Sequence, residues 1–147
     1  ECVCPEIGVR ETATVVGLET ITGEDYVSGR IWPEAVCHAF YPVDIHGLDT
    51  ATWKQTFLAP GSVPTVPRGA LVAMGRPGLL MAGRILSSDR AANSALRVQA
   101  TCMATGQAAG ALAALAVKRG LDPAVVPMRD LRALLRRHGA IVPSARG

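Results

Sequence analysis

The stretch from Val98 to Lys118 constrains the fold of this chain more than any other part. It runs for about twenty residues without proline and without a charge before Lys118, and small and aliphatic residues dominate it. Such a run predicts one long helix buried on nearly all sides, because it offers no polar face to water. Gly106 and Gly110 lie on one face of this helix, where another backbone or a flat ligand can approach closely. Helix packing alone is the favoured explanation of the two glycines, because they lie two turns beyond the start of the helix.

The same length and lack of charge also fit a helix that spans a membrane. Alanine is only weakly hydrophobic, however, and no aromatic residues flank the stretch. Four of its residues are polar and therefore costly in lipid, namely Gln99, Thr101, Thr105 and Gln107. We therefore expect no membrane partner, whereas the membrane alternative predicts that the protein depends on detergent.

Composition narrows the class of protein further. With 147 residues, 49% of them hydrophobic and 18% charged, the chain is expected to form one compact core. The net charge is +3 and the arginines are not interleaved with aromatic residues, so we expect no nucleic-acid partner. The four cysteines do not fit a small disulfide scaffold, and Cys2-Val3-Cys4 lacks the spacing of common zinc sites, so we expect reduced thiols and no metal. The absence of a leader and of an initial methionine predicts a cytoplasmic piece of a longer protein.

Short elements are expected before the long helix. Val9–Ile21 is rich in threonine and valine, as half-buried strands are, and Gly17 marks a bend within it. Thr22, followed three residues later by Asp25, resembles a capping box. This pattern predicts a short helix that ends at Gly29.

The rest of the chain alternates apolar runs with turns. Residues 39–45 predict a strand, and residues 47–67, with three prolines, predict a long ordered loop. Leu79–Ala82 predicts a buried strand that ends at Gly83 and Arg84. Leucines at helical spacing before Gly139 predict an amphipathic last helix. Its solvated face is expected to carry Arg129, Arg132, Arg136 and Arg137.

Three segments stand out by their order and spacing, namely Met81-Ala82-Gly83-Arg84, Ser94-Ala95-Leu96-Arg97-Val98 and the run from Cys102 to Gly110. Together they resemble the C-terminal signature of a family of bacterial FAD-dependent oxidoreductases. The similarity extends from about Gly8 to Ile141 and includes the Val43-Asp44-Ile45-His46-Gly47 segment.

The resemblance implies an α/β fold, present here as an α+β fragment. The fragment would be the C-terminal part of a Rossmann-like FAD/NAD(P)-binding domain, of the glutathione-reductase-like kind in which two distant parts of the chain form the FAD site. Residues 1–67 would be a remnant of the substrate or cap domain, and residues 68–147 the C-terminal segment of the FAD-binding domain. The expected partners are FAD, a small organic substrate and a missing N-terminal dinucleotide-binding segment.

That missing segment matters because the Gly-x-Gly-x-x-Gly turn, which places a pyrophosphate at a helix N-terminus, does not occur in the 147 residues. We therefore expect this chain to bind FAD poorly by itself. The predicted function is to supply the flavin-facing half of the cofactor site for hydride transfer between an organic substrate and FAD. The alternative is a non-catalytic remnant or packing module that completes another chain.

The resemblance also implies a set of site residues. A glycine at the end of the strand would let the backbone approach the ribityl chain and pyrophosphate, and the arginine after it would offer its guanidinium to phosphate oxygens. The amides at the start of the long helix would stabilise negative charge on the pyrimidine ring of the reduced flavin. Pairing of both arginines with Asp89 is the alternative. The expected cofactor-binding residues are Gly83, Arg84, Arg97, Val98, Gln99 and Ala100.

His46 is the candidate catalytic residue. It lies beside Asp44, and an imidazole near neutrality suits a proton transfer coupled to hydride transfer. A structural hydrogen bond that holds the following loop explains His46 equally well. Cys102, on the long helix, is expected to be a small core residue.

Overall fold

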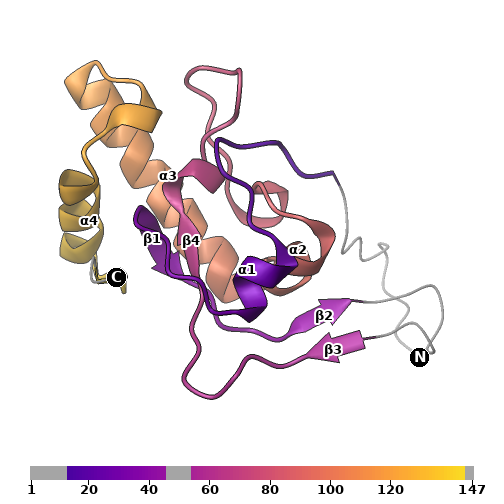
Figure 1. Cartoon of the computed structure of the whole chain (residues 1–147). Helices are drawn as coiled ribbons and strands as arrows, with labels where there is room; N and C mark the ends of the chain where they lie inside the picture. Colours follow the sequence, from indigo (N-terminus) through magenta and orange to yellow (C-terminus); the bar gives the residue numbers. More distant parts are fainter. Residues whose placement is uncertain (1–12, 46–53, 145–147) are drawn as a thin grey trace, which may run out of the picture.

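The computed structural model describes residues 13–45 and 54–144, which form a mixed α+β arrangement (Figure 1). The α-helices are α1 (Gly23–Val27), α2 (Arg90–Leu96), α3 (Gln99–Arg119) and α4 (Met128–Arg137). The strands are β1 (Ala35–His38), β2 (Val43–Ile45), β3 (Lys54–Thr56) and β4 (Thr65–Pro67). Short 3₁₀ turns are formed by Arg68–Ala70, Gly83–Ile85 and Pro123–Val125.

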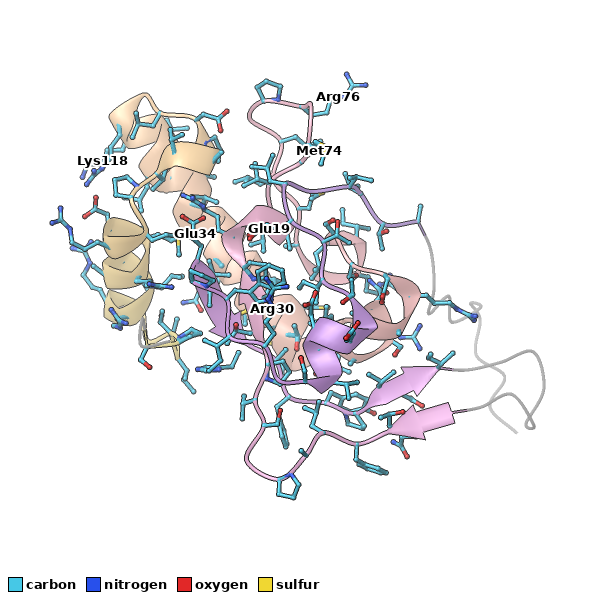
Figure 2. The ribbon with its side chains drawn as sticks, viewed as in Figure 1. Glu19, Arg30, Glu34, Met74, Arg76 and Lys118 are labelled. Atoms are coloured by element: carbon cyan, nitrogen blue, oxygen red, sulfur yellow. The ribbon has the colours of Figure 1, made fainter. Side chains whose placement is uncertain are left out.

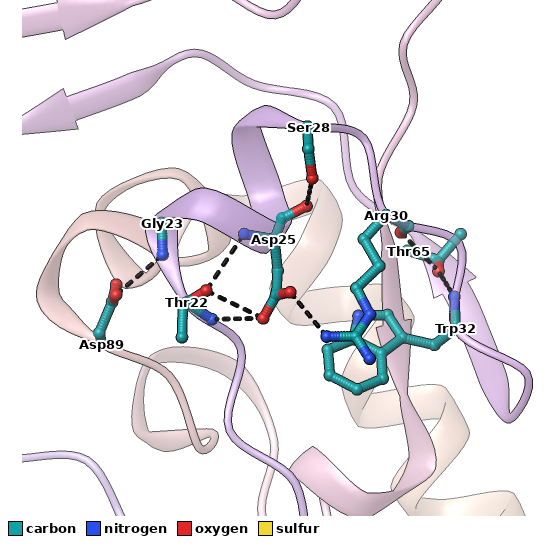
Figure 3. A network of polar contacts seen from close by, with 8 residues as sticks. All are labelled: Thr22, Gly23, Asp25, Ser28, Arg30, Trp32, Thr65 and Asp89. Carbon is teal, nitrogen blue, oxygen red and sulfur yellow. Dashed lines mark hydrogen bonds and ion pairs between the residues drawn. The ribbon is translucent and has the colours of Figure 1, made fainter.

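The helix α1 forms where the capping box predicts it. Thr22 Oγ1 accepts a hydrogen bond from the backbone N–H of Asp25 at 3.1 Å, and the Asp25 carboxylate accepts one from the backbone N–H of Thr22 at 3.2 Å. Gly29 follows the helix with a φ of 74°, which confirms the predicted end. Asp89 accepts a hydrogen bond from the backbone N–H of Gly23 at 2.8 Å and thereby ties α1 to the segment before α2 (Figure 3).

An aromatic contact and a buried threonine fix the chain after α1. The Arg30 guanidinium lies 3.6 Å from the centroid of the Trp32 ring and also pairs with Asp25 at 2.7 Å. Thr65 Oγ1, on β4, accepts a hydrogen bond from the backbone N–H of Trp32 at 3.0 Å (Figure 3). These contacts hold the turn at residues 33–34 that leads into β1.

The strands form two separate antiparallel pairs. β1 pairs with β4, with an irregularity between Ala35 and Cys37, and β2 pairs with β3. The expected strand over 39–45 is therefore wrong in its bounds, because β1 and β2 lie on either side of residues 39–42. The expected loop over 47–67 contains β3 and β4 in its described part. Prolines and glycines mark the turns, but they do not reveal the three-residue strands between them.

Two other expected strands are reduced to isolated bridges. The described part of the strand expected over 9–21 contacts its neighbours through Gly17 with Ala73 and Ile21 with Ser88. The strand expected over 79–82 retains a bridge between Leu80 and Val72, and Gly83–Ile85 is a 3₁₀ turn rather than a strand end. Within residues 13–45 and 54–144, these bridges do not extend into longer β-ladders. A strand requires a paired neighbour along its length, so neither segment forms the expected strand.

The helix α2 was not predicted from the sequence pattern. It begins after Asp89, whose carboxylate accepts a hydrogen bond from the backbone N–H of Ala92 at 2.8 Å. The helix ends at Leu96, and Arg97 and Val98 separate it from α3. The aspartate before an alanine-rich run is the sequence signal that could have located this helix.

The helix α3 confirms the predicted long helix but not its environment. Its buried residues form one stripe, whereas Met103 and Val117 are 75% and 84% exposed. Burial on nearly all sides is therefore wrong for the described chain, because alanine favours a helix whether it is exposed or buried. The helix is long and apolar enough to cross a membrane, and 28% of its most apolar window is buried within the chain. The buried stripe consists of Thr101, Thr105, Ala108, Leu112 and Ala116.

The core lies between α3, the β1–β4 pair and the helices α1, α2 and α4 (Figure 1). The helix α4 packs along α3 and ends before Gly139, which has a φ of 77° as its predicted role requires. The largest fully buried side chains are Tyr26, Ile21, Leu71, Leu86, Leu96, Leu112, Leu131, Leu135, Val36, Val66, Val126 and Thr65.

Arg132 corrects the expectation of a solvated arginine face on α4. This residue is 8% exposed, and its guanidinium donates to the carbonyl oxygens of Pro33 at 2.6 Å and Ala35 at 3.1 Å. Arg68 is similarly buried and donates to the carbonyl of Val126 at 2.6 Å and to Glu34 at 2.5 Å; Figure 2 shows where Glu34 lies. Two buried arginines thus connect the C-terminal helix region to β1 and β4, and sequence spacing does not reveal which arginine of α4 turns inward.

Candidate functional site

The candidate site begins at the 3₁₀ turn Gly83–Ile85, which packs against α3. Gly83 has a φ of 67°, a left-handed conformation that glycine adopts without strain. Its backbone N–H donates to Thr105 Oγ1 at 3.0 Å. A Cβ added to Gly83 would lie 3.5 Å from Cys102 Sγ, which is ordinary contact. The backbone conformation therefore requires glycine here, and the missing side chain faces α3.

Arg84 continues this turn and is exposed. Its backbone carbonyl accepts a hydrogen bond from Asn93 Nδ2, on α2, at 3.0 Å. Asn93 is 6% exposed, and Nδ2 also donates to Ser88 Oγ at 3.1 Å. The turn is thus held by α3 on one side and by α2 on the other.

The start of α3 forms the second part of the site. The cap residue is Val98, which has no side-chain oxygen, and Gln99 and Ala100 are both exposed. The first hydrogen bond within the helix runs from the N–H of Cys102 to the carbonyl of Val98 at 2.9 Å. The N–H groups of the preceding first turn have no partner within the helix, and they carry a partial positive charge. This helix start therefore offers hydrogen-bond donors and positive potential at the surface.

Arg97 lies half-buried at the junction between α2 and α3. Its guanidinium donates to the backbone carbonyl of Asp44 on β2 at 3.4 Å. The backbone N–H of Asp44 donates to Ser94 Oγ on α2 at 3.0 Å. Arg97 and Ser94 thus join β2 to this junction.

The structure places the Gly83–Arg84 turn against α3 at Cys102 and Thr105 and against α2 at Asn93. The cofactor roles of Val98, Gln99 and Ala100 at the start of α3 stay predictions. Asp89, the alternative partner of the two arginines, uses both carboxylate oxygens as helix caps. His46 lies outside the described residues, which end at Ile45 on that side, so its catalytic role stays a prediction.

Cys102 lies on the second turn of α3, beside Gly83. Burial raises the pKa of its thiol, and the nearby Arg84 guanidinium partly offsets this effect. The thiol is therefore protonated near neutrality, which suits a small packing residue better than a reactive thiolate.

Three hollows in the described part of the chain lie along other faces of α3. One of about 510 Å³ lies between β1 and α3 and includes His38 and Met103. One of about 410 Å³ lies between α3 and α4, and one of about 250 Å³ lies near Gly120. Gly83 and the first turn of α3 do not line any of these three hollows.

Two residues of this region escaped the sequence reasoning. Thr105 accepts from Gly83 and also donates to the carbonyl of Thr101 in its own helix at 2.9 Å. A bond to the carbonyl four residues earlier is usual for a mid-helix threonine, so the sequence does not indicate that Thr105 also accepts from Gly83. Asn93 is a poor helix former inside an alanine-rich helix, and this mismatch is the signal that could have identified it.

Comparison with protein families gave one match. The family described as FAD dependent oxidoreductase matches residues 2–135, which include every element named above except the end of α4. No curated protein and no solved structure matches the chain.

Proposed function

The chain belongs to the FAD-dependent oxidoreductase family, and from this premise we propose that it supplies the flavin-facing half of an FAD site for hydride transfer between an organic substrate and the flavin. FAD is the cofactor that membership of this family implies. The observation that carries the proposal is the exposed, uncapped start of α3 beside the Gly83–Arg84 turn.

The residues of this surface fit one half of the cofactor. The first turn of α3 presents backbone N–H groups and positive potential, and Arg84 presents a guanidinium at the surface. A grip on the adenosine half requires the Gly-x-Gly-x-x-Gly turn, which does not occur in the 147 residues. The flavin end of FAD therefore fits this chain, and the dinucleotide-binding turn must come from other polypeptide.

Each part of the surface has a separate task in the proposed site. When bound, the flavin supplies the hydride chemistry, with the ring gaining negative charge on reduction. In the proposed site the amides of Gln99 and Ala100 stabilise such charge, because fixed dipoles near a developing charge lower its energy without reorganisation. Arg84 binds phosphate oxygens, and Arg97 holds the junction by its bond to Asp44. His46 takes or gives the proton that accompanies hydride transfer.

The same proposal includes the domain organisation of the whole enzyme. Residues 68–147 form the C-terminal segment of a glutathione-reductase-like, Rossmann-like FAD domain in a bacterial, cytoplasmic enzyme, and residues 1–67 are the remnant of its substrate or cap domain. The missing N-terminal segment supplies the parallel strands of that domain. Alone, the chain has little activity.

The open face of α3 favours a second candidate function. Added Cβ atoms at Gly106 and Gly110 would meet nothing within 4 Å, and Met103 and Val117 are exposed. A helix with small and apolar exposed residues suits packing against another polypeptide. The second candidate is therefore a non-catalytic module that completes another chain through this face.

Titration with FMN, followed by amide NMR of the isotope-labelled chain, separates these candidates. FMN contains the flavin ring without the adenosine half, so we expect its shifts to cluster at Gly83, Gln99 and Ala100. Adenosine, which has neither the flavin ring nor a phosphate, is the control and is expected to leave these amides unchanged. Scattered FMN shifts, with none at the start of α3, would overturn the flavin proposal and favour the packing module. A chain that purifies with stoichiometric FAD would contradict the expected lack of an adenosine grip.

A further inference from the structure

Two buried side chains hold the backbone of the Gly83–Arg84 segment from opposite sides. Thr105 Oγ1, on α3, accepts from the N–H of Gly83 at 3.0 Å, and Asn93 Nδ2, on α2, donates to the carbonyl of Arg84 at 3.0 Å. Thr105 is fully buried and Asn93 is 6% exposed. The two side chains are thus themselves shielded from water, and neither is available to contact a ligand.

Each of these side chains is in turn fixed by a second hydrogen bond. The Thr105 hydroxyl donates to the carbonyl of Thr101 at 2.9 Å, and Asn93 Nδ2 also donates to Ser88 Oγ at 3.1 Å. A side chain with two partners has one orientation, so it transmits the position of its own helix to the turn that it holds. The location of Gly83 is thereby tied to α3, and the location of Arg84 to α2.

The backbone at this turn needs such support. Gly83 has a φ of 67°, and the turn is a single 3₁₀ turn of three residues followed by extended backbone at Leu86. Within the turn, the N–H of Leu86 donates to the carbonyl of Gly83 at 3.3 Å, and from outside it the N–H of Val15 donates to the carbonyl of Ile85 at 3.0 Å. Short 3₁₀ turns have weak internal bonds, so their position depends on contacts from outside.

We propose that Thr105 and Asn93 are positioning residues of the cofactor site, which set the distance between the Gly83–Arg84 segment and the start of α3. This inference rests on the proposed flavin function. The two side chains do not touch the cofactor. They align the guanidinium-bearing turn with the amides of the first turn of α3, so that both meet one ligand.

The test compares Thr105→Val with Thr105→Ser and with Thr65→Val. Valine keeps the shape of threonine but leaves the Gly83 N–H without its acceptor, and serine restores the hydroxyl. Thr65→Val is the matched control, because Thr65 Oγ1 also accepts a backbone N–H, that of Trp32, at 3.0 Å, and it lies on β4 away from the site. Each variant is measured for amide hydrogen exchange at Gly83 without ligand and for its Kd for FMN from the NMR shifts at Gln99.

In Thr105→Val we expect exchange at Gly83 to rise about tenfold or more, and the Kd for FMN to rise about threefold to tenfold, because the lost bond normally restricts local opening. Thr105→Ser is expected to restore both values to within about twofold. Thr65→Val is expected to leave both within about twofold although it destabilises the chain. If Thr105→Val does not fold, Asn93→Ala replaces it, since alanine favours α2 and removes only the bonds of the amide.

The outcomes are distinct. Faster exchange at Gly83 together with an unchanged Kd for FMN would overturn the positioning role alone. An equal loss of FMN affinity in Thr65→Val would reduce the effect to general destabilisation and would also overturn it. Absence of any FMN response in the unsubstituted chain would overturn the proposed function, and the positioning role with it.

Discussion

Replacement of Arg132 by methionine tests whether the buried arginine of α4 stabilises the fold. The Arg132 guanidinium donates to the carbonyl of Pro33 at 2.6 Å and to that of Ala35 at 3.1 and 3.2 Å. Methionine keeps the length of the aliphatic part but provides no donor. The substitution therefore leaves the carbonyl oxygens of Pro33, before β1, and of Ala35, at the start of β1, without their hydrogen-bond donor on α4.

Two opposing effects determine how much Arg132→Met lowers the free energy of unfolding. An orphaned buried polar group costs about 1–3 kcal/mol, so two carbonyls with partial access to water cost about 3 kcal/mol together. Removal of the charge gains back part of this, because burial of the guanidinium is itself unfavourable and lowers the pKa of Arg132. A net loss of about 2 kcal/mol is expected, and with a urea m-value of about 2 kcal/mol/M the midpoint falls by about 1 M.

The assay is urea unfolding followed by far-UV circular dichroism. Arg129→Met is the matched control, because the Arg129 side chain is 90% exposed on the same helix and makes a 3.4 Å surface pair with Asp130. Its midpoint is expected to move by less than about 0.25 M, since exposed pairs contribute at most a few tenths of a kcal/mol. Equal midpoints for Arg132→Met and Arg129→Met would refute the structural role of Arg132.

Two further predictions concern the N-terminal half. Gly29→Ala is expected to lower the urea midpoint more than Gly61→Ala does. Both glycines have a positive φ, but only a Cβ at residue 29 would overlap Ser62 Oγ. Equal losses of stability in the two variants would contradict the steric contribution of Ser62. Burial raises the pKa of Glu19 above 4.5 in the folded chain, so the folded state binds more protons than the unfolded state above that pH. Stability of the unsubstituted chain is therefore expected to fall relative to Glu19→Gln as pH rises from 4.5 through the folded pKa, and pH-independent parallel curves would contradict this.

Sequence reasoning succeeded where the physical cause is local. Thr22 and Asp25 are three residues apart and cap α1 through their own backbone, so the pattern contains all the information needed. The long uncharged run likewise predicted α3 to within one residue at each end, because helix propensity acts residue by residue. The segments quoted for the family resemblance lie within residues 2–135, and membership of the FAD-dependent oxidoreductase family is confirmed.

The failures concern partners that are distant in sequence. Arg132 has the same spacing on α4 as its exposed neighbours, and only the approach of β1 decides that it turns inward. Thr105 and Gly83 are 22 residues apart, and their hydrogen bond depends on how the segment between them folds, which no local pattern reveals. The environment of α3 was mistaken for the same reason, since exposure depends on which elements pack beside it. The roles of the predicted site residues stay predictions, because a cofactor role depends on a bound ligand.

The carboxylate of Asp89 has a consequence for how the chain melts. One oxygen accepts from the N–H of Gly23 at the start of α1, beside the Thr22–Asp25 capping box, and the other caps α2 through Ala92, each at 2.8 Å. A single side chain thus joins the first turns of two helices that lie in different halves of the sequence, so fraying of either start weakens a contact of the other. Heating should therefore release both in the same cooperative step, seen as one calorimetric peak, even though the two halves are proposed to descend from different domains.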